Sequence, residues 1–271
     1  MSVSTNSVER LVEIMAQLRN PNGGCAWDLA QDFTTIAPYT IEEVYELAEA
    51  IENNDVKAIK EELGDVLFQT IFYAQMGKEA GWFDLNSVAN AVADKMIERH
   101  PHVFGSRSAE TPDDVAANWE TDKEAKRKAQ AEAEGRVSSA LDGVSTALPA
   151  ATRAMKLQSR AARVGFDWTK AQDVLAKIRE EIEELEHEIK SKADKDFLED
   201  ELGDVFFAVI NLARKLDVDP ETALRRTNRK FERRFRGIES ILAAQGRTTA
   251  DASLNEMEGI WNKIKKEEKY L

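Results

Sequence analysis

Cysteine is nearly absent from this chain of 271 residues, since Cys25 is the only one. A single cysteine excludes an internal disulfide framework, so the composition favours a cytoplasmic protein. Apolar runs are also short, and none approaches the roughly 20 residues that cross a bilayer. The first residues lack the basic segment and apolar stretch of a secretion signal. We therefore expect a protein with no membrane partner.

Positive charge and aromatic side chains are scarce as well. Lys and Arg number 37 against 50 Asp and Glu, which gives a formal net charge of -13, and aromatic residues make up 7%. A protein that coats nucleic acid needs a basic face, so the charge argues against a nucleic-acid partner. Small anionic ligands stay open, because a bound metal ion can reverse the local field.

Signals for β-strands are weak, whereas apolar residues recur with helical spacing along most of the chain. Examples are Val44, Leu47, Ala48 and Ile51 in the first half, and Ile178, Ile182, Leu185 and Ile189 in the second. Such stripes cover one face of an amphipathic helix. We therefore predict an all-α fold, and the length is enough for one or two domains.

An internal repeat divides the chain. The paired segments are CAWD (25–28) with GFDW (165–168), EEVYE (42–46) with EEIEE (180–184), and EELGDVLF (61–68) with EDELGDVFF (199–207). The period of about 140 residues exceeds the roughly 50 of solenoid repeats, so duplication of a domain is the simpler explanation. We predict one domain over 1–122 and a second over 146–271. Residues 123–145, which are polar and alanine-rich at first, are expected to link them.

Acidic residues in the first half have the spacing of a metal site. Glu43 and Glu46 are three residues apart, as are Glu62 and Asp65, so each pair lies on one face of its helix. A polar turn centred on residue 54 separates the two helices and makes them antiparallel neighbours. Glu46 and Glu62 are each 8 residues from this turn, and the other two acids are each 11. In an antiparallel hairpin, residues at equal distances from the turn lie at the same level along the two helices. The four carboxylates are therefore predicted to meet.

The second half repeats this arrangement around a turn between residues 192 and 193. Glu184 and Glu201 are equidistant from that turn, and so are Glu181 and Asp204. Four converging carboxylates repel one another unless a cation compensates them. Ligation by oxygen atoms alone suits a hard divalent ion, so Mg²⁺ is predicted at both clusters, with Mn²⁺ as an alternative ion.

Two simpler interpretations explain the acids without a metal. Charge-rich helices carry acids on solvated faces, and Thr40 with Glu43 could form a capping box at a helix start. Against the second, the residue that matches Thr40 is Ile178, which cannot cap a helix. Against the first, Gly64 and Gly203 lie inside the acidic helices, where glycine costs about 1 kcal/mol relative to alanine. Close approach of another helix or a ligand would explain both glycines.

A di-iron carboxylate site is a further metal hypothesis. Glu184 and His187 have the Glu-x-x-His spacing that such sites use. Di-iron sites need this motif on two helices, and Glu49 stands in place of His187 in the first half. We therefore favour magnesium and expect His187 at the surface.

Residues 224–236 hold seven Arg or Lys in this acidic chain. A solvated basic face is one interpretation. The other is a phosphate site, because Lys230 and Arg234 share one helical face and Asn228 lies nearby. Carboxylate-bound metal opposite Lys and Arg is the usual arrangement around a polyphosphate. The matching residues of the first half are Lys95 and Arg99.

Trp119 and Trp261 each precede a lysine by four residues. Each could be a core anchor, or could stack on a nucleobase. The sequence has no P-loop, no GxGxxG and no Ser/Cys–His arrangement for covalent catalysis.

At these residues the chain resembles the MazG nucleoside triphosphate pyrophosphohydrolases. The matching features are EExxE followed by ExxD, present twice, and the phrases NGGCAWD, IAPYTIEE, ERHPHVF, VGFDW and NRKFERRF. The resemblance covers nearly the whole chain, with two four-helix-bundle-like domains in tandem. It implies an all-α, Mg²⁺-dependent homodimer that cleaves nucleoside triphosphates between the α and β phosphates. The products would be the monophosphate and pyrophosphate, and the role would be house-cleaning of nucleotide pools with broad base tolerance.

The resemblance also implies roles for single residues. Glu181, Glu184, Glu201 and Asp204 would hold Mg²⁺ against the triphosphate, and Glu180 would bind a second ion or orient the attacking water. Lys230 and Arg234 would neutralise phosphate charge, with Asn228 beside them, and Trp261 would pack on the base. The first half could act in the same way through Glu43, Glu46, Glu62 and Asp65, but it has fewer basic residues at the matching place. We therefore expect the C-terminal half to be the principal catalyst.

Two other functions stay open at this point. One is an all-α pyrophosphatase restricted to a single deoxynucleotide such as dUTP or dCTP, which a substrate panel would reveal. The other is a helical scaffold whose duplicated acids bind a basic protein partner. A scaffold would bind Mg²⁺ weakly, and its thermal stability would not respond to Mg²⁺ with nucleotide.

Overall fold

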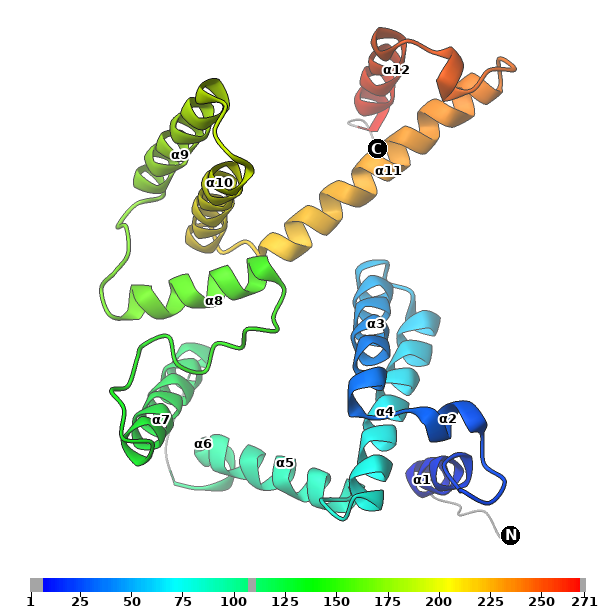
Figure 1. The fold of residues 1–271 in the computed structure, drawn as a ribbon, viewed down its shortest axis with the longest axis vertical. Helices are drawn as coiled ribbons and strands as arrows, with labels where there is room; N and C mark the ends of the chain where they lie inside the picture. The colour runs from blue at the N-terminus through cyan, green and yellow to red at the C-terminus, as the bar shows by residue number, and fades with distance from the viewer. Residues whose placement is uncertain (1–6, 107–110, 269–271) are drawn as a thin grey trace. The chain divides into compact units, whose positions relative to one another are not determined.

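The structure, a computed structural model, describes residues 7–106 and 111–268. Every regular element in these ranges is a helix, and no strand occurs within them (Figure 1). This confirms the all-α prediction. No helix in the described ranges is both long enough and apolar enough to cross a membrane.

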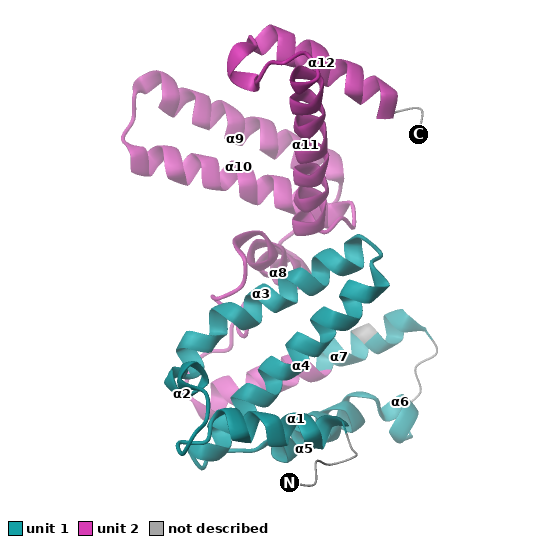
Figure 2. Cartoon of the chain, turned by 90° about the vertical axis from the view of Figure 1, so that its right-hand side faces the viewer, with its two compact units in different colours: residues 1–121 teal, residues 122–271 magenta. Residues whose placement is uncertain are grey.

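The chain divides into two compact units, residues 1–121 and 122–271 (Figure 2). The first unit contains α1 (Ser7–Leu18), α2 (Ala26–Ala30), α3 (Phe33–Glu52), α4 (Val56–Glu79), α5 (Leu85–Arg99) and α6 (Pro101–Phe104). The helix α7 (Pro112–Ala133) runs across the division. The second unit continues with α8 (Ala150–Arg163), α9 (Ala171–Ser191), α10 (Lys195–Lys215), α11 (Pro220–Ala243), the short 3₁₀ helix η1 (Thr249–Asp251) and α12 (Leu254–Glu267). The expected linker over 123–145 covers the end of α7 and part of the irregular stretch that follows.

An antiparallel hairpin of α3 and α4 forms the centre of the first unit. The Asp32 side chain caps α3 by accepting hydrogen bonds from the backbone N–H groups of Thr34 and Thr35. The connection is residues 53–55, centred on Asn54, whose left-handed φ of 54° makes the tight turn. This matches the predicted position of the turn. Thr40 lies inside α3 and donates to the Ile36 carbonyl, so the alternative of a capping box at Thr40 is wrong.

The matching hairpin of the second unit consists of α9 and α10. Residues 192–194 connect the two helices, and Lys192 adopts a left-handed φ of 56°. The predicted turn between 192 and 193 falls within this connection. Two helices of this length joined by three residues must lie antiparallel. Residues at equal distances from the turn therefore lie at the same level along the two helices.

Both units bury amide side chains beside apolar ones. In the first unit Met15, Ile36, Ile71, Phe72 and Met76 form one buried apolar cluster, and Gln69 of α4 is a buried amide. In the second unit the buried side chains include two amides, Gln158 of α8 and Asn211 of α10, beside apolar residues such as Val174, Ala208 and Leu242. The amides lie where α8 packs on α10.

The long helix α11 pairs with α12 at its C-terminal end (Figures 1 and 2). Gly237 allows this pairing, because a Cβ at this position would lie 2.7 Å from Ile264. Asp219 caps the other end of α11 by accepting from the Thr222 backbone N–H at 2.7 Å.

Candidate metal and phosphate site

The first hairpin brings three of its four predicted acids together. Glu43 of α3 and Glu62 and Asp65 of α4 can each place a carboxylate oxygen within 4.8 Å of the others. Partial burial, followed by the charges of Asp65, Glu46 and Glu62, raises the pKa of Glu43. Partial burial and the charge of Glu46 also raise the pKa of Glu62. Glu46 therefore lies near the other three acids without joining their group.

The second hairpin repeats this grouping. Glu181, Glu201 and Asp204 can bring one oxygen each within the same 4.8 Å. The fourth acid, Glu184, lies beside Glu181, and the nearby Glu181 carboxyl group, followed by desolvation, raises the pKa of Glu184. Both hairpins thus form a group of three carboxylates with the fourth beside it. Oxygen donors at this spacing suit a hard divalent cation.

Lys177 is a neighbour of the second cluster that the sequence reasoning missed. Its ammonium lies 2.8 Å from a carboxylate oxygen of Glu180 and 2.8 Å from one of Glu181. The hydrogen bonds to Glu180 and Glu181 raise the pKa of Lys177. Lys177 precedes Glu181 by four residues, so the i, i+4 rule could have found it. Tyr39 stands at the matching position of the first half.

An open hollow of about 460 Å³ adjoins the second cluster. Its lining consists of acids and one histidine: Glu180, Glu183, Glu184, His187, Glu188 and Glu201. His187 is exposed, as predicted. The two groups of possible metal ligands in the described residues contain carboxylates alone, so nothing in them favours a di-iron site.

Gly64 and Gly203 do not contact a helix of the same chain. A Cβ added at either glycine would have no atom of the structure within 4 Å. Of the two explanations offered for these glycines, approach by another helix of the same chain is therefore not supported, and approach by a ligand stays a prediction. Each glycine lies between the acids of its own cluster, on a face that is open to another molecule.

The predicted phosphate-binding residues lie away from the acids within one chain. Lys230 and Asn228 are exposed on α11, which packs on α12 and α8. Arg234 lies 2.7 Å from Glu268, and its guanidinium is 5.4 Å from the ring centre of Trp261. Among the described residues, neither Lys230 nor Arg234 forms an ion pair with the acids of α9 or α10.

The matching residues of the first unit lie on α5. Lys95 is exposed, and the Arg99 carbonyl accepts a hydrogen bond from the indole N–H of Trp119 at 2.6 Å. His100 lies edge-on to the Trp119 ring with a centroid distance of 5.2 Å. Trp119 is therefore used to pack the end of α5.

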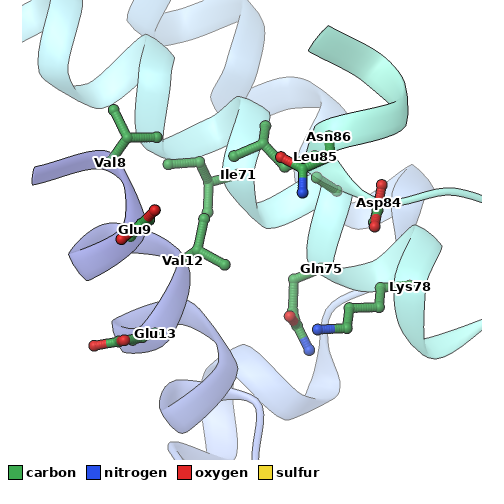
Figure 3. A pocket seen from close by; sticks show the side chains of 11 residues that line it. Val8, Glu9, Val12, Glu13, Ile71, Gln75, Lys78, Asp84, Leu85 and Asn86 are labelled. Atoms are coloured by element: carbon green, nitrogen blue, oxygen red, sulfur yellow. The ribbon is translucent and has the colours of Figure 1, made fainter. Parts of the chain in front are cut away.

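A separate hollow of about 450 Å³ lies in the first unit between α1 and the junction of α4 with α5 (Figure 3). Figure 3 shows Val12 of α1 beside Ile71 of α4, with Glu9 and Glu13 on the α1 side. None of the four acids of the first hairpin lines it. This hollow is thus distinct from the first carboxylate cluster.

The family of the chain follows from comparison with known proteins. The model of the MazG nucleotide pyrophosphohydrolase domain matches twice, at residues 31–104 and 169–237. The chain belongs to the MazG family. Both matches contain one complete acidic hairpin, which confirms the tandem arrangement.

Two curated relatives match along nearly their full length. The nucleoside triphosphate pyrophosphohydrolase of Escherichia coli strain K12 is 47% identical over 264 residues, which cover 97% of this chain and 98% of the relative. The nucleoside triphosphate pyrophosphohydrolase/pyrophosphatase MazG of Thermotoga maritima is 40% identical over 257 residues, which cover 95% of each chain.

Proposed function

We propose that this chain is a Mg²⁺-dependent nucleoside triphosphate pyrophosphohydrolase whose principal site is the C-terminal carboxylate cluster. The observation that carries the proposal is the grouping of Glu181, Glu201 and Asp204 within 4.8 Å beside an open hollow. The family and the names of the two relatives support the reaction.

The residues of the cluster fit Mg²⁺, with Mn²⁺ as an alternative ion. They offer carboxylate oxygens only, and Glu184, which stands beside the three, would be the fourth ligand. When bound, the ion supplies positive charge that neutralises phosphate oxygens and lowers the pKa of a water molecule. The first hairpin could bind the same ion through Glu43, Glu46, Glu62 and Asp65.

The remaining chemistry belongs to Lys177 and Glu180. Lys177 holds the Glu180 carboxylate in place at the edge of the cluster. We assign to Glu180 the orientation of the attacking water and acceptance of its proton. The water oxygen bonds to the phosphorus of the α phosphate, the bond from that phosphorus to the α–β bridging oxygen breaks, and pyrophosphate leaves. The enzyme forms no covalent intermediate in this scheme.

A second copy of the chain would complete the site. Lys230 and Arg234 suit phosphate oxygens, yet α11 does not pack along α9 or α10 among the described residues. The acidic hairpin also exposes large apolar side chains in the single chain, among them Ile182, Leu202 and Phe206. Exposed apolar faces of this kind mark association surfaces. We therefore propose a homodimer in which α11 of one copy approaches the acids of the other.

Broad base tolerance and a house-cleaning role in the cytoplasm are part of the proposal. Both follow from the family resemblance. Lys95 and Arg99 would bind phosphate in the first half. We expect weaker activity there, because this half has fewer basic residues at the matching place. The prediction that Trp261 packs on the base stays open, because Trp261 contacts Arg234 and Phe231.

Product analysis tests the proposed function. The purified protein is incubated with each common NTP and dNTP and Mg²⁺, and the products are separated by ion-exchange chromatography. Monophosphate and pyrophosphate in equal amounts, from several bases, are the expected result. Diphosphate with orthophosphate would contradict the bond assignment, turnover of dUTP or dCTP alone would contradict base tolerance, and no turnover would favour the scaffold.

A further inference from the structure

A small aromatic cavity of about 240 Å³ lies in the second unit, outside the carboxylate cluster. It is lined by α8, by the segments before and after α8, and by α10. Its apolar walls are Leu157, Phe166, Trp168 and Phe207. The last three rings are partly exposed, so a ligand can reach the cavity from solvent. A site for a whole drug-sized ligand has roughly 300–1,000 Å³, so this volume suits one ring system.

A buried amide in this cavity lacks a partner. Gln158 is only 6% exposed, and its amide nitrogen donates to the Phe207 carbonyl at 2.7 Å. Its amide oxygen is buried and accepts no hydrogen bond from any described residue. Buried acceptors are nearly always satisfied, because an unpaired one keeps the full penalty of losing water. A ligand that donates a hydrogen bond would satisfy it.

A second amide lines the cavity from α10. Asn211 is 5% exposed, and its amide oxygen accepts from the Arg214 guanidinium at 2.8 and 3.1 Å. The amide nitrogen of Asn211 can therefore donate a hydrogen bond to a ligand. The cavity therefore combines a buried acceptor and a donor with aromatic walls. A planar heterocycle with N–H groups and ring acceptors matches this combination.

The cavity lies at a suitable distance from the carboxylates. Asp204 and Asn211 are seven residues apart on α10, so they share one face and are separated by roughly 10 Å along the axis. Phe207, one turn beyond Asp204, links the two places. A nucleotide extended along α10 would put its phosphates at the acids and its base at the amides.

The matching place of the first half is occupied by a buried aromatic side chain. Seven residues beyond Asp65 stands Phe72, which is 1% exposed and packs with Met15, Ile36 and Ile71. An apolar ring thus stands in the first half where the second half has the amide of Asn211.

From these observations we propose that the cavity around Gln158, Asn211 and Trp168 binds the nucleobase of the substrate. The proposal rests on the proposed function and adds to it the place where the base is held. Every nucleobase carries an N–H donor, an acceptor and a flat face, so one amide pair with aromatic walls accepts several bases. The cavity is an alternative to Trp261, which lies on α12.

The first experiment separates base contacts from phosphate contacts. KM for ATP and the inhibition constant of inorganic triphosphate are measured with Mg²⁺ for wild type, Gln158→Leu and Asn211→Phe. Gln158→Leu removes the acceptor, and Asn211→Phe introduces the residue of the first half. Each should raise KM for ATP about 10-fold and leave the inhibition constant of inorganic triphosphate unchanged.

Gln69→Leu is the matched control, since Gln69 is a buried amide of α4 in the first half. It should leave both constants unchanged, and circular dichroism establishes that each variant is folded. Equal changes for ATP and inorganic triphosphate, or none, would overturn the proposal. So would a Trp261→Phe variant that alone reproduces the loss of ATP binding.

A second experiment needs no turnover. Adenosine 5′-monophosphate is titrated without metal, and the change in tryptophan fluorescence of wild type is compared with that of Trp168→Phe and Gln158→Leu. We expect a saturable change that both substitutions abolish. If it persists in both variants, the cavity does not hold the base. A Trp168-dependent change in a protein that hydrolyses no nucleotide would uphold the cavity and refute the proposed reaction.

Discussion

The two halves of this chain share one acidic hairpin but surround it differently. In the C-terminal half, Lys177 lies against Glu180 and Glu181 and compensates part of the carboxylate charge. In the N-terminal half Tyr39 takes the matching position, and repulsion contributes to the raised pKa values of Glu43 and Glu62. The two halves therefore share the acids but not the cation that lies beside them.

The cores show the same divergence. The first half closes its hairpin with an apolar cluster that includes Phe72, whereas the second half places Asn211 at that point beside a cavity. A close-packed apolar core stabilises the fold. A cavity lined with amides loses packing contacts, but it offers space and hydrogen-bonding groups to a ligand. This difference supports the proposal that the C-terminal half is the principal catalyst.

The largest expected effect distinguishes the two carboxylate clusters. Glu201→Gln should lower kcat/KM for ATP by about 100-fold or more, because changes beside a metal already cost about 10–100-fold. The matched change Glu62→Gln should cost less than about 5-fold. Pyrophosphate release under identical Mg²⁺ concentrations measures both. Equal losses in the two variants would mean that both halves catalyse.

The second prediction concerns Lys177. Lys177→Met should tighten Mg²⁺ binding to the nucleotide-free protein by about 5-fold, because the ammonium no longer opposes the ion. Tyr39→Lys should weaken binding at the first cluster by a similar factor. Isothermal titration calorimetry measures both affinities. Unchanged affinity in Lys177→Met would show that the lysine does not influence the cluster.

The third prediction concerns stability without metal. A carboxyl group with a raised pKa binds more protons when folded, so the free energy of unfolding falls as the pH rises from its ordinary pKa to the raised one. Above that range the ionised acids of the first cluster repel. Glu43→Gln should therefore raise the melting temperature at pH 7 by about 2 °C.

The matched change in the second half should have the opposite sign. Glu181→Gln should lower the melting temperature by about 2 °C, because it removes a buried partner of Lys177. Differential scanning calorimetry in EDTA measures both variants. A gain in both would show that Lys177 does not compensate the second cluster.

The smallest effect concerns the basic helix of the second half. Hydrogen bonds from Arg233 and Arg234 lower the pKa of Glu268 to about 2. The stability that this acid contributes is therefore complete above its ordinary pKa near 4.5 and is lost as the pH falls towards 2. Arg234→Met should move the pKa of Glu268 back towards 4.5, as followed by NMR titration of its carboxyl carbon. An unchanged pKa would show that Arg233 alone holds the acid.

The sequence was sufficient for the hairpins and their acids, because helical period and turn residues are local signals. Offsets from residues 54 and 192–193 placed Glu43, Glu62 and Asp65 together, and likewise Glu181, Glu201 and Asp204. Gly64 left two explanations open, because a glycine inside a helix indicates that space is needed without identifying the group that approaches. Lys177 could have been found at its i, i+4 spacing. The course of α11 away from the acids could not, because it depends on contacts between distant segments.

The buried state of Gln158 was equally invisible in the sequence. A glutamine in a polar, basic helix is expected at the surface. Gln158 is buried only because α8 packs on α10. The contrast between Phe72 and Asn211 could not be predicted for the same reason. Its significance becomes clear only when the structure shows that the two residues occupy matching positions in the two halves.

Counting the tight nucleotide sites per chain tests the central claim most directly. An ATP analogue with a methylene group between the α and β phosphates is titrated with Mg²⁺ into wild type, Asp204→Asn and Asp65→Asn. We predict one tight site per chain, lost in Asp204→Asn and kept in Asp65→Asn. Two equivalent sites per chain, each lost with its own aspartate, would contradict the assignment of catalysis to the C-terminal half.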